Sequence, residues 1–88
     1  MNKKDDILVK LESDPSYREV FTEIVRKKSV RLHDLKSAMH SLGEERTEAY
    51  LKTFTDANLV KELKSQVHDF NTYYITAIGL QAGRKLAR

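Results

Sequence analysis

The chain has 88 residues, 40% of them hydrophobic and 33% charged, which suffices for one globular domain with a modest core and excludes a disordered tail. It contains no cysteine, which excludes a disulfide framework and a thiolate metal site, and no apolar run suits a membrane span or a signal peptide, so we expect a cytoplasmic protein. The net charge of +3 is divided: residues 15–43 and 61–88 each carry +3, whereas residues 44–60 carry −2 and residues 1–14 carry −1.

Two helices are predicted in the first third of the chain. The first, at about residues 5–12, is so short that it must pack on the rest of the chain to be stable. Its apolar face is formed by Ile7, Leu8 and Leu11. The second starts at Pro15 and is the clearest in the chain, because its apolar residues follow the helical spacing i, i+3, i+4, i+7, i+8. These residues are Tyr17, Val20, Phe21, Ile24 and Val25. Pro15 suits a first helical turn, and Ser16 and Glu19 have the spacing of a capping box.

The middle of the chain is predicted to hold two further helices. Residues 29–31 between them and the second helix are too few for more than a turn or a brief strand. One helix is expected at about residues 33–41, and its inward residues are Leu32, Leu35 and Met39. The next is expected at about residues 44–56, and its inward residues are Thr47, Tyr50, Leu51 and Phe54. Gly43 before this helix and Asn58 after it suit left-handed backbone.

From Leu59 onward the apolar spacing changes from about 3.6 to 2, which predicts a β-hairpin. The first strand is expected to carry Leu59, Leu63 and Val67 on one face, and the second to span residues 73–76. We expect Tyr73 and Tyr74 to lie on opposite faces of the hairpin, although with Phe70 they also suit a base-stacking platform or an exposed partner contact. A last helix is predicted at about residues 77–87, with Thr76 as its N-cap. The predicted fold class is mainly α with a small β-hairpin (α+β).

Two pieces of the chain resemble winged helix-turn-helix regulators. Residues 50–60 (YLKTFTDANLV) resemble the pattern h-L-x-x-L-x-x-x-G-L-V at the end of a recognition helix, with Asn58 in place of the usual glycine. Residues 75–79 (ITAIG) resemble the L-T-x-x-G with which many wings pass into a final helix. The chain is therefore similar to small prokaryotic transcription regulators of the MarR and ArsR kinds. The resemblance implies one domain over residues 1–88, with a helical extension at 1–14, a winged-helix core at 15–76 and a C-terminal helix at 77–88.

The resemblance also implies sequence-specific binding of duplex DNA by a transcription regulator. The helix at about 44–56 would enter the major groove, and the hairpin at about 59–76 would act as the wing. The candidates on the helix, for base edges or phosphates, are Arg46, Lys52 and Thr53. The candidates for backbone contacts at the preceding helix are Arg31, Lys36 and Ser37. The candidates on the wing are Lys64, His68 and Asn71.

The outward surface of the same helix is acidic, which leaves a second function open. Glu44, Glu45 and Glu48 lie near its N-terminus, where carboxylates repel phosphate. Acidic residues are also favoured at this position by the helix dipole, so these glutamates suit a structural role as well. The alternative is a winged-helix module that does not bind DNA and contacts a protein through the acidic helix surface or the wing.

The sequence does not predict a metal site, a cofactor or an enzyme. His33 and His40 lie about two helical turns (~10 Å) apart, which is too far for both to hold one zinc ion. None of the three glycines forms a phosphate-binding loop. The adjacent acidic pairs at residues 5–6 and 44–45 do not face each other on a helix. No small-molecule ligand is evident.

Apolar residues near both ends exceed what a three-helix core and a wing need. They are Ile7, Leu8, Leu11, Ile78, Leu80 and Leu86. They suit either folding back onto the same chain or association of two chains. Since added terminal helices commonly build a two-fold dimer in winged-helix repressors, we expect a homodimer.

Overall fold

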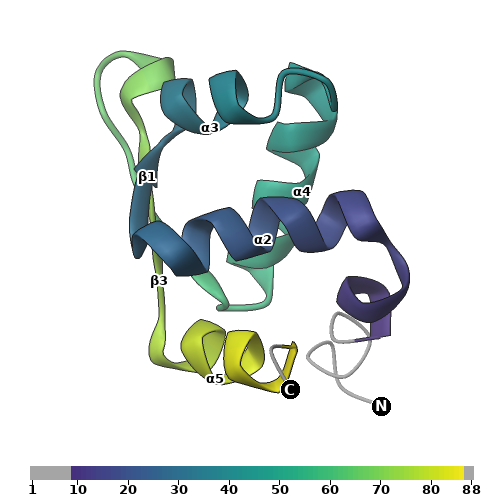
Figure 1. Cartoon of the computed structure of the whole chain (residues 1–88). Helices are drawn as coiled ribbons and strands as arrows, with labels where there is room; N and C mark the ends of the chain where they lie inside the picture. The colour runs from purple at the N-terminus through teal and green to yellow at the C-terminus, as the bar shows by residue number, and fades with distance from the viewer. Residues whose placement is uncertain (1–8, 87–88) are drawn as a thin grey trace.

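The computed structural model describes residues 9–86, in which four helices and a helical segment at residues 9–13 accompany a three-stranded antiparallel sheet (Figure 1). In chain order the elements are α2 (Pro15–Lys27), β1 (Ser29–Arg31), α3 (Leu32–Ala38), α4 (Glu44–Asp56), β2 (Val60–Leu63), the 3-10 turn η1 (His68–Phe70), β3 (Thr72–Ile75) and α5 (Ala77–Leu86). The predicted class, mainly helical with a small antiparallel sheet, is confirmed. Within residues 9–86, no helix is long and apolar enough to cross a membrane.

Helix α2 begins with a cap that differs from the predicted one. The N-cap is Asp14, whose Oδ1 accepts hydrogen bonds from the backbone N–H groups of Ser16 and Tyr17 at 3.1 and 3.3 Å. Pro15 occupies the first helical turn, as predicted. The predicted capping box of Ser16 and Glu19 is wrong, because Ser16 already lies inside the helix and the carboxylate of Asp14 satisfies the free N–H groups there.

The core lies between the helices and one face of the sheet. The predicted inward residues of α2, α3 and α4 are buried, apart from Val25 and Tyr50, which are partly buried against the core. The ring of Phe54 lies 4.8 Å from that of Tyr17 and 5.2 Å from that of Phe21, measured between centroids. Such aromatic pairs add to the stability gained from apolar burial. Helix α3 ends at Ala38, before the predicted position, because residues 39–42 form a turn.

Two residues with positive φ bracket α4, as the sequence predicts. Gly43 has φ 98° and ψ 148° at the N-cap of the helix, a conformation essentially restricted to glycine. Asn58 has φ 62° after the last turn, and the chain then enters β2. These two positions explain why the bounds of α4 are the predicted ones.

The sheet has the order β1–β3–β2, so that β3 pairs with both other strands. One row across the strands consists of Ser29, Tyr74 and Lys61, and another consists of Arg31, Thr72 and Leu63. Between them lies the row of Val30, Tyr73 and Glu62. Because side chains alternate between the two faces of a strand, the first two rows share the outer face, and the third lies on the inner face, which packs on the helices. Val30 and Tyr73 are accordingly buried.

The predicted apolar face of the first hairpin strand is wrong. Leu59 is buried but precedes β2, whereas Leu63 and Val67 are 59% and 52% exposed. The reason is the register: Val60 pairs with Ile75, which puts Val60 on the inner face and Leu63 on the outer one. Val67 lies beyond the four-residue strand, in the loop before η1.

The described terminal segments pack on the chain itself. Leu11 is fully buried in the core, and Leu80 and Leu86 are partly buried. Thr76 caps α5 as predicted, since its Oγ1 accepts a hydrogen bond from the N–H of Gly79 at 3.0 Å. Ile78 remains 39% exposed, and Ile7 and Leu8 lie outside the described residues. The homodimer stays a prediction.

Candidate nucleic-acid interface

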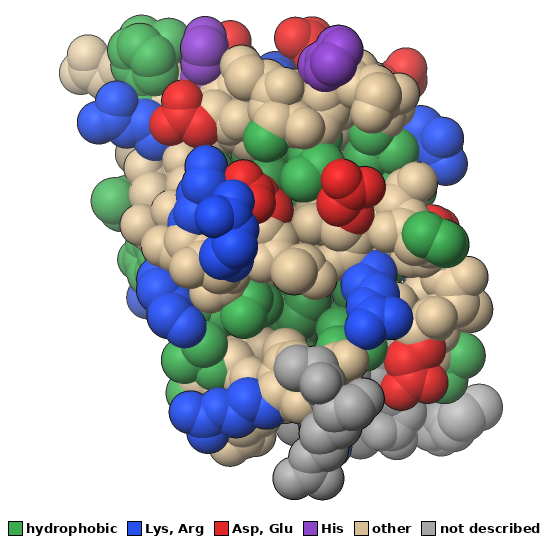
Figure 2. Space-filling view, in the orientation of Figure 1, with side chains coloured by type: hydrophobic (Ala, Val, Ile, Leu, Met, Phe, Trp, Pro, Cys, Tyr) green, Lys and Arg blue, Asp and Glu red, His purple; other side chains and the backbone are tan. Residues whose placement is uncertain are grey.

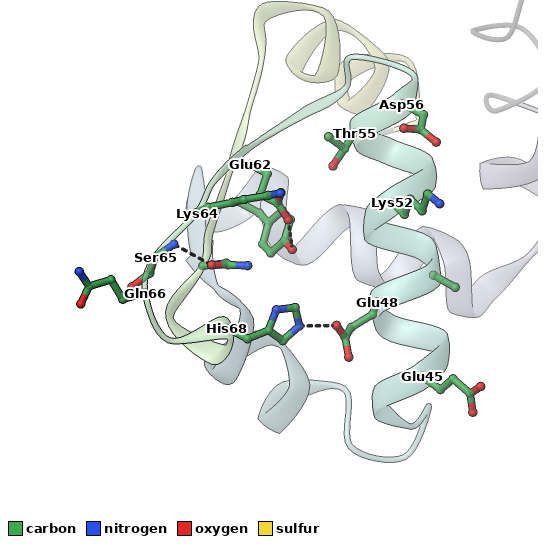
Figure 3. Close-up of a pocket in the computed structure, with 13 residues that line it drawn as sticks. Glu45, Glu48, Lys52, Thr55, Asp56, Glu62, Lys64, Ser65, Gln66 and His68 are labelled. Carbon is green, nitrogen blue, oxygen red and sulfur yellow. Dashed lines mark hydrogen bonds and ion pairs between the residues drawn. The ribbon is translucent and has the colours of Figure 1, made fainter.

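A cleft of about 760 Å³ separates α4 from the hairpin of β2 and β3 (Figure 3). The wall from α4 is lined by Glu45, Glu48, Ala49, Lys52, Thr55 and Asp56. The wall from the hairpin is lined by Glu62, Lys64, Ser65, Gln66, His68, Asn71 and Tyr73. The helix and the hairpin that the sequence predicts to contact DNA therefore face each other across one open groove.

Glu48 is the centre of an ion network at the end of this cleft. Its carboxylate lies 2.6 Å from Nε2 of His68, which is oriented toward it in Figure 3, and 3.4 Å from Nζ of Lys36. Nζ of Lys36 also lies 3.0 Å from the carboxylate of Asp69, and the Lys36 side chain is only 12% exposed. The network joins α3, α4 and η1, and so holds the tip region of the hairpin against both helices.

The network shifts the pKa values of its members. The hydrogen bond from His68, and then the nearby Lys36, lower the pKa of Glu48 below its ordinary value. The hydrogen bond to Asp69 and the charge of Glu48 raise the pKa of Lys36, and the same bond lowers the pKa of Asp69. All three groups are therefore held in their charged forms. Lys36 and His68, both predicted as DNA contacts, are engaged with carboxylates.

Asn71 is a structural residue of the hairpin. It is 5% exposed, and its Oδ1 accepts a hydrogen bond from the backbone N–H of Ser65 at 2.8 Å. Beside it, the hydroxyl of Tyr73 donates to Glu62 at 2.5 Å, and burial together with this bond raises the pKa of Tyr73. These bonds lie on the inner side of the hairpin, where only 5% of Asn71 is exposed at the wall of the cleft.

Of the remaining predicted contacts, two are exposed at the cleft. Lys52 projects from α4, and Lys64 extends from the hairpin toward the helix (Figure 3). Thr53 is half-buried on the same helix, where its hydroxyl donates to the carbonyl of Ala49 at 3.1 Å.

The other three lie elsewhere. Arg46 projects toward α2, beside a second hollow that includes Ser16 and Glu19, and it donates to the hydroxyl of Tyr50 at 3.3 Å. Ser37 is exposed on α3, where its hydroxyl donates to the carbonyl of His33 at 3.1 Å. Arg31 lies on the outer face of the sheet. The nine predicted residues therefore do not form one surface.

The carboxylates of the cleft differ in what surrounds them. Glu48 and Glu62 have the hydrogen-bond partners given above, whereas Glu45 and Asp56 are exposed. Glu44 and Glu45 occupy the first turn of α4, where the helix dipole favours acidic residues.

The sequence did not predict the ion network around Glu48, because the members of this network come from three separate elements. It also missed Lys61, because the predicted apolar face of Leu59 and Leu63 includes this position, and only the pairing of Lys61 with Tyr74 places it on the outer face.

Comparison of the chain with protein-family models, with curated proteins and with solved structures found no match. Within residues 9–86, no group of three or more His, Asp or Glu side chains is arranged to hold a metal ion. A function for this chain must therefore be argued from the chemistry of its own surfaces.

Proposed function

We propose that this protein is a winged helix-turn-helix protein that binds duplex DNA, with α4 in the major groove and the β2–β3 hairpin along the backbone. The observation that carries the proposal is the exposed outward face of α4 beside an open cleft, with a lysine on each wall. Helix-turn-helix proteins dock in this way, with one exposed helix in the groove and neighbouring elements on the phosphates.

The ion network reduces the main objection to this proposal, which is the acidic character of α4. Glu48 is paired with Lys36 and His68, so its carboxylate does not meet phosphate as an unpaired charge. Glu44 and Glu45 are at the helix N-terminus, where part of their charge is offset by the dipole. Lys52 and Lys64 are then the charged groups best placed to contact phosphate, while Lys36 and His68 position the hairpin.

As a transcription regulator, the protein would act as a two-fold dimer. Such a dimer presents its two recognition helices to major grooves one turn, about 34 Å, apart. Val9 and Ile78 are exposed apolar residues in the two terminal segments, and they suit this contact.

The test is fluorescence anisotropy of a labelled random-sequence duplex, titrated with the protein at several salt concentrations. We expect log K to fall linearly with log salt, with a slope of about −0.9 for each phosphate contact. Lys52→Ala and Lys64→Ala should each reduce the slope by about 1. Lys85→Ala on α5 removes the same charge from an exposed site outside the cleft and should leave the slope unchanged. Absence of binding at low salt, or equal effects of all three substitutions, would refute the proposal.

A second candidate is supported by the exposed carboxylates of the cleft. Glu45 and Asp56 project from α4, and a basic segment of another protein would complement them. In this case a lysine-rich peptide would bind where duplex DNA does not. Glu45→Gln with Asp56→Asn would weaken the peptide complex, and Lys52→Ala would not.

A further inference from the structure

The outer face of the sheet is a second surface, on the opposite side of the hairpin from the cleft. It consists of two rows that run across all three strands: Ser29, Tyr74 and Lys61, and next to them Arg31, Thr72 and Leu63. None of these six residues is acidic. In Figure 1 the helices α2 and α4 lie on one side of the strands, so this face is directed away from them.

The acidic residues of the hairpin are turned away from the outer face. Glu62 accepts the hydrogen bond from Tyr73 on the inner face, and Asp69 is paired with Lys36 of α3. Arg31 and Lys61 remain exposed on the outer face, and exposed Lys28 directly precedes β1. Figure 2 shows blue side chains on the left of the molecule, where β1 and the end of α2 lie, with green ones and a red one among them. The charge of this face is complementary to a polyanion.

Two aromatic side chains lie among these cations. Tyr74 is half-buried at the centre of its row, directly between Ser29 and Lys61. Phe70 is 49% exposed, and the guanidinium of Arg31 lies 5.9 Å from the centre of its ring. Aromatic rings beside cationic side chains are the combination with which proteins bind unpaired bases and their phosphates.

We propose that the outer face of the sheet binds single-stranded DNA, with bases stacked on Tyr74 and Phe70 and phosphates paired with Arg31 and Lys61. A duplex does not suit this face, because its bases are already stacked on one another and offer no free ring surface. A second copy of the chain does not suit this face either, because a two-fold contact would place two faces with the same positive charge against each other. The choice of DNA over RNA as the ligand rests on the proposed function. The evidence for a single-strand site on this face is independent of that function.

The experiment is anisotropy of a labelled 12-nucleotide oligo-dT, titrated with the full chain at low and moderate salt. Tyr74→Leu removes the ring but keeps an apolar side chain, and it should weaken binding about 5-fold or more. Lys61→Ala should weaken binding and reduce the salt slope, whereas Tyr74→Phe should bind normally. Lys85→Ala, on α5, is the matched control and should leave oligo-dT binding unchanged. Circular dichroism of each variant verifies that it is folded.

Several outcomes would overturn this proposal. The first two are absence of oligo-dT binding and binding by Tyr74→Leu that equals binding by the unmodified protein. The other two are tighter binding of an RNA of matched sequence than of oligo-dT, and displacement of oligo-dT by an oligo-glutamate peptide of the same charge. The last would identify an acidic protein segment as the occupant. Failure here is distinct from failure of the proposed function, because duplex binding is tested by Lys52→Ala and Lys64→Ala, and these leave the outer face intact.

Discussion

Adjacent tyrosines of β3 lie in opposite environments. Tyr73 is 5% exposed on the inner face, where its hydroxyl donates to Glu62, whereas Tyr74 is half-buried on the outer face between Ser29 and Lys61. The same alternation separates Glu62 from Lys61 on β2. Since a shift of one residue in register would exchange the two faces, the pairing of the strands determines which chemistry faces the helices.

The two faces also differ in how their charges are balanced. On the inner side, near the cleft, Glu48 and Asp69 are paired with Lys36, and Glu62 accepts a hydrogen bond from the Tyr73 hydroxyl. On the outer side the strand residues are cationic or neutral. A small net charge of +3 therefore conceals one side with mixed charges and a strand face whose charged residues, Arg31 and Lys61, are both cationic.

The largest expected effect concerns the two tyrosines themselves. Tyr73→Ala should lower the free energy of unfolding by about 3–5 kcal/mol, because it leaves a cavity on the inner face and removes the partner of Glu62. Tyr74→Ala is the matched control and should cost about 1 kcal/mol or less, as expected for a partly exposed strand position. Equilibrium unfolding in urea measures both values. Equal losses would mean that the two faces do not differ in packing.

A smaller effect is expected where the inner face meets α5. A Cβ added to Gly79 would lie 2.1 Å from the carbonyl oxygen of Leu59 and 2.6 Å from Cδ1 of Ile75. Because the carbonyl oxygen of Leu59 belongs to the backbone and cannot easily move aside, we expect Gly79→Ala to lower the free energy of unfolding by about 1–3 kcal/mol. A Cβ added to Gly83 on the same helix meets the side chain of Val25, at 3.1 Å and beyond, and Gly83→Ala gains helix propensity. Gly83→Ala should therefore change Tm little, whereas Gly79→Ala should lower it clearly. Thermal unfolding of both variants measures this, and a comparable decrease of Tm in both would contradict the tight contact at Gly79.

Local sequence patterns predicted the helices well. The bounds of α4 follow from an inner face at helical spacing with Gly43 and Asn58 on either side, all of which are visible in the sequence. The cap of α2 was mistaken because Asp14 and Ser16 are both good capping residues, and only the backbone geometry distinguishes them.

The strand face and the site depend on contacts between distant residues. Leu59, Leu63 and Val67 are spaced by four, which suits one face of a strand, but the pairing of Val60 with Ile75 determines the register. His68 is 20 residues from Glu48, and Lys36 is 33 from Asp69. Pairs so far apart cannot be recognised from local pattern, so the pairing of Lys36 and His68 with carboxylates was not predicted.

The smallest effect tests whether the balanced charges of the inner side stabilise the fold. Because His68 and Lys36 lower the pKa of Glu48, its ionised form stabilises the folded state above the ordinary pKa of about 4.5. This contribution is lost as the pH falls through the lower pKa of the folded state. We therefore expect Glu48→Gln to reduce stability at pH 7 by less than about 1 kcal/mol, since solvent screens a partly exposed group, and to have little effect at pH 3. Glu45→Gln, on the same helix but exposed, is the control and should change little at either pH. Urea unfolding at both pH values measures the difference, and a loss at pH 7 that persisted at pH 3 would mean that Glu48 acts through packing and not through its charge.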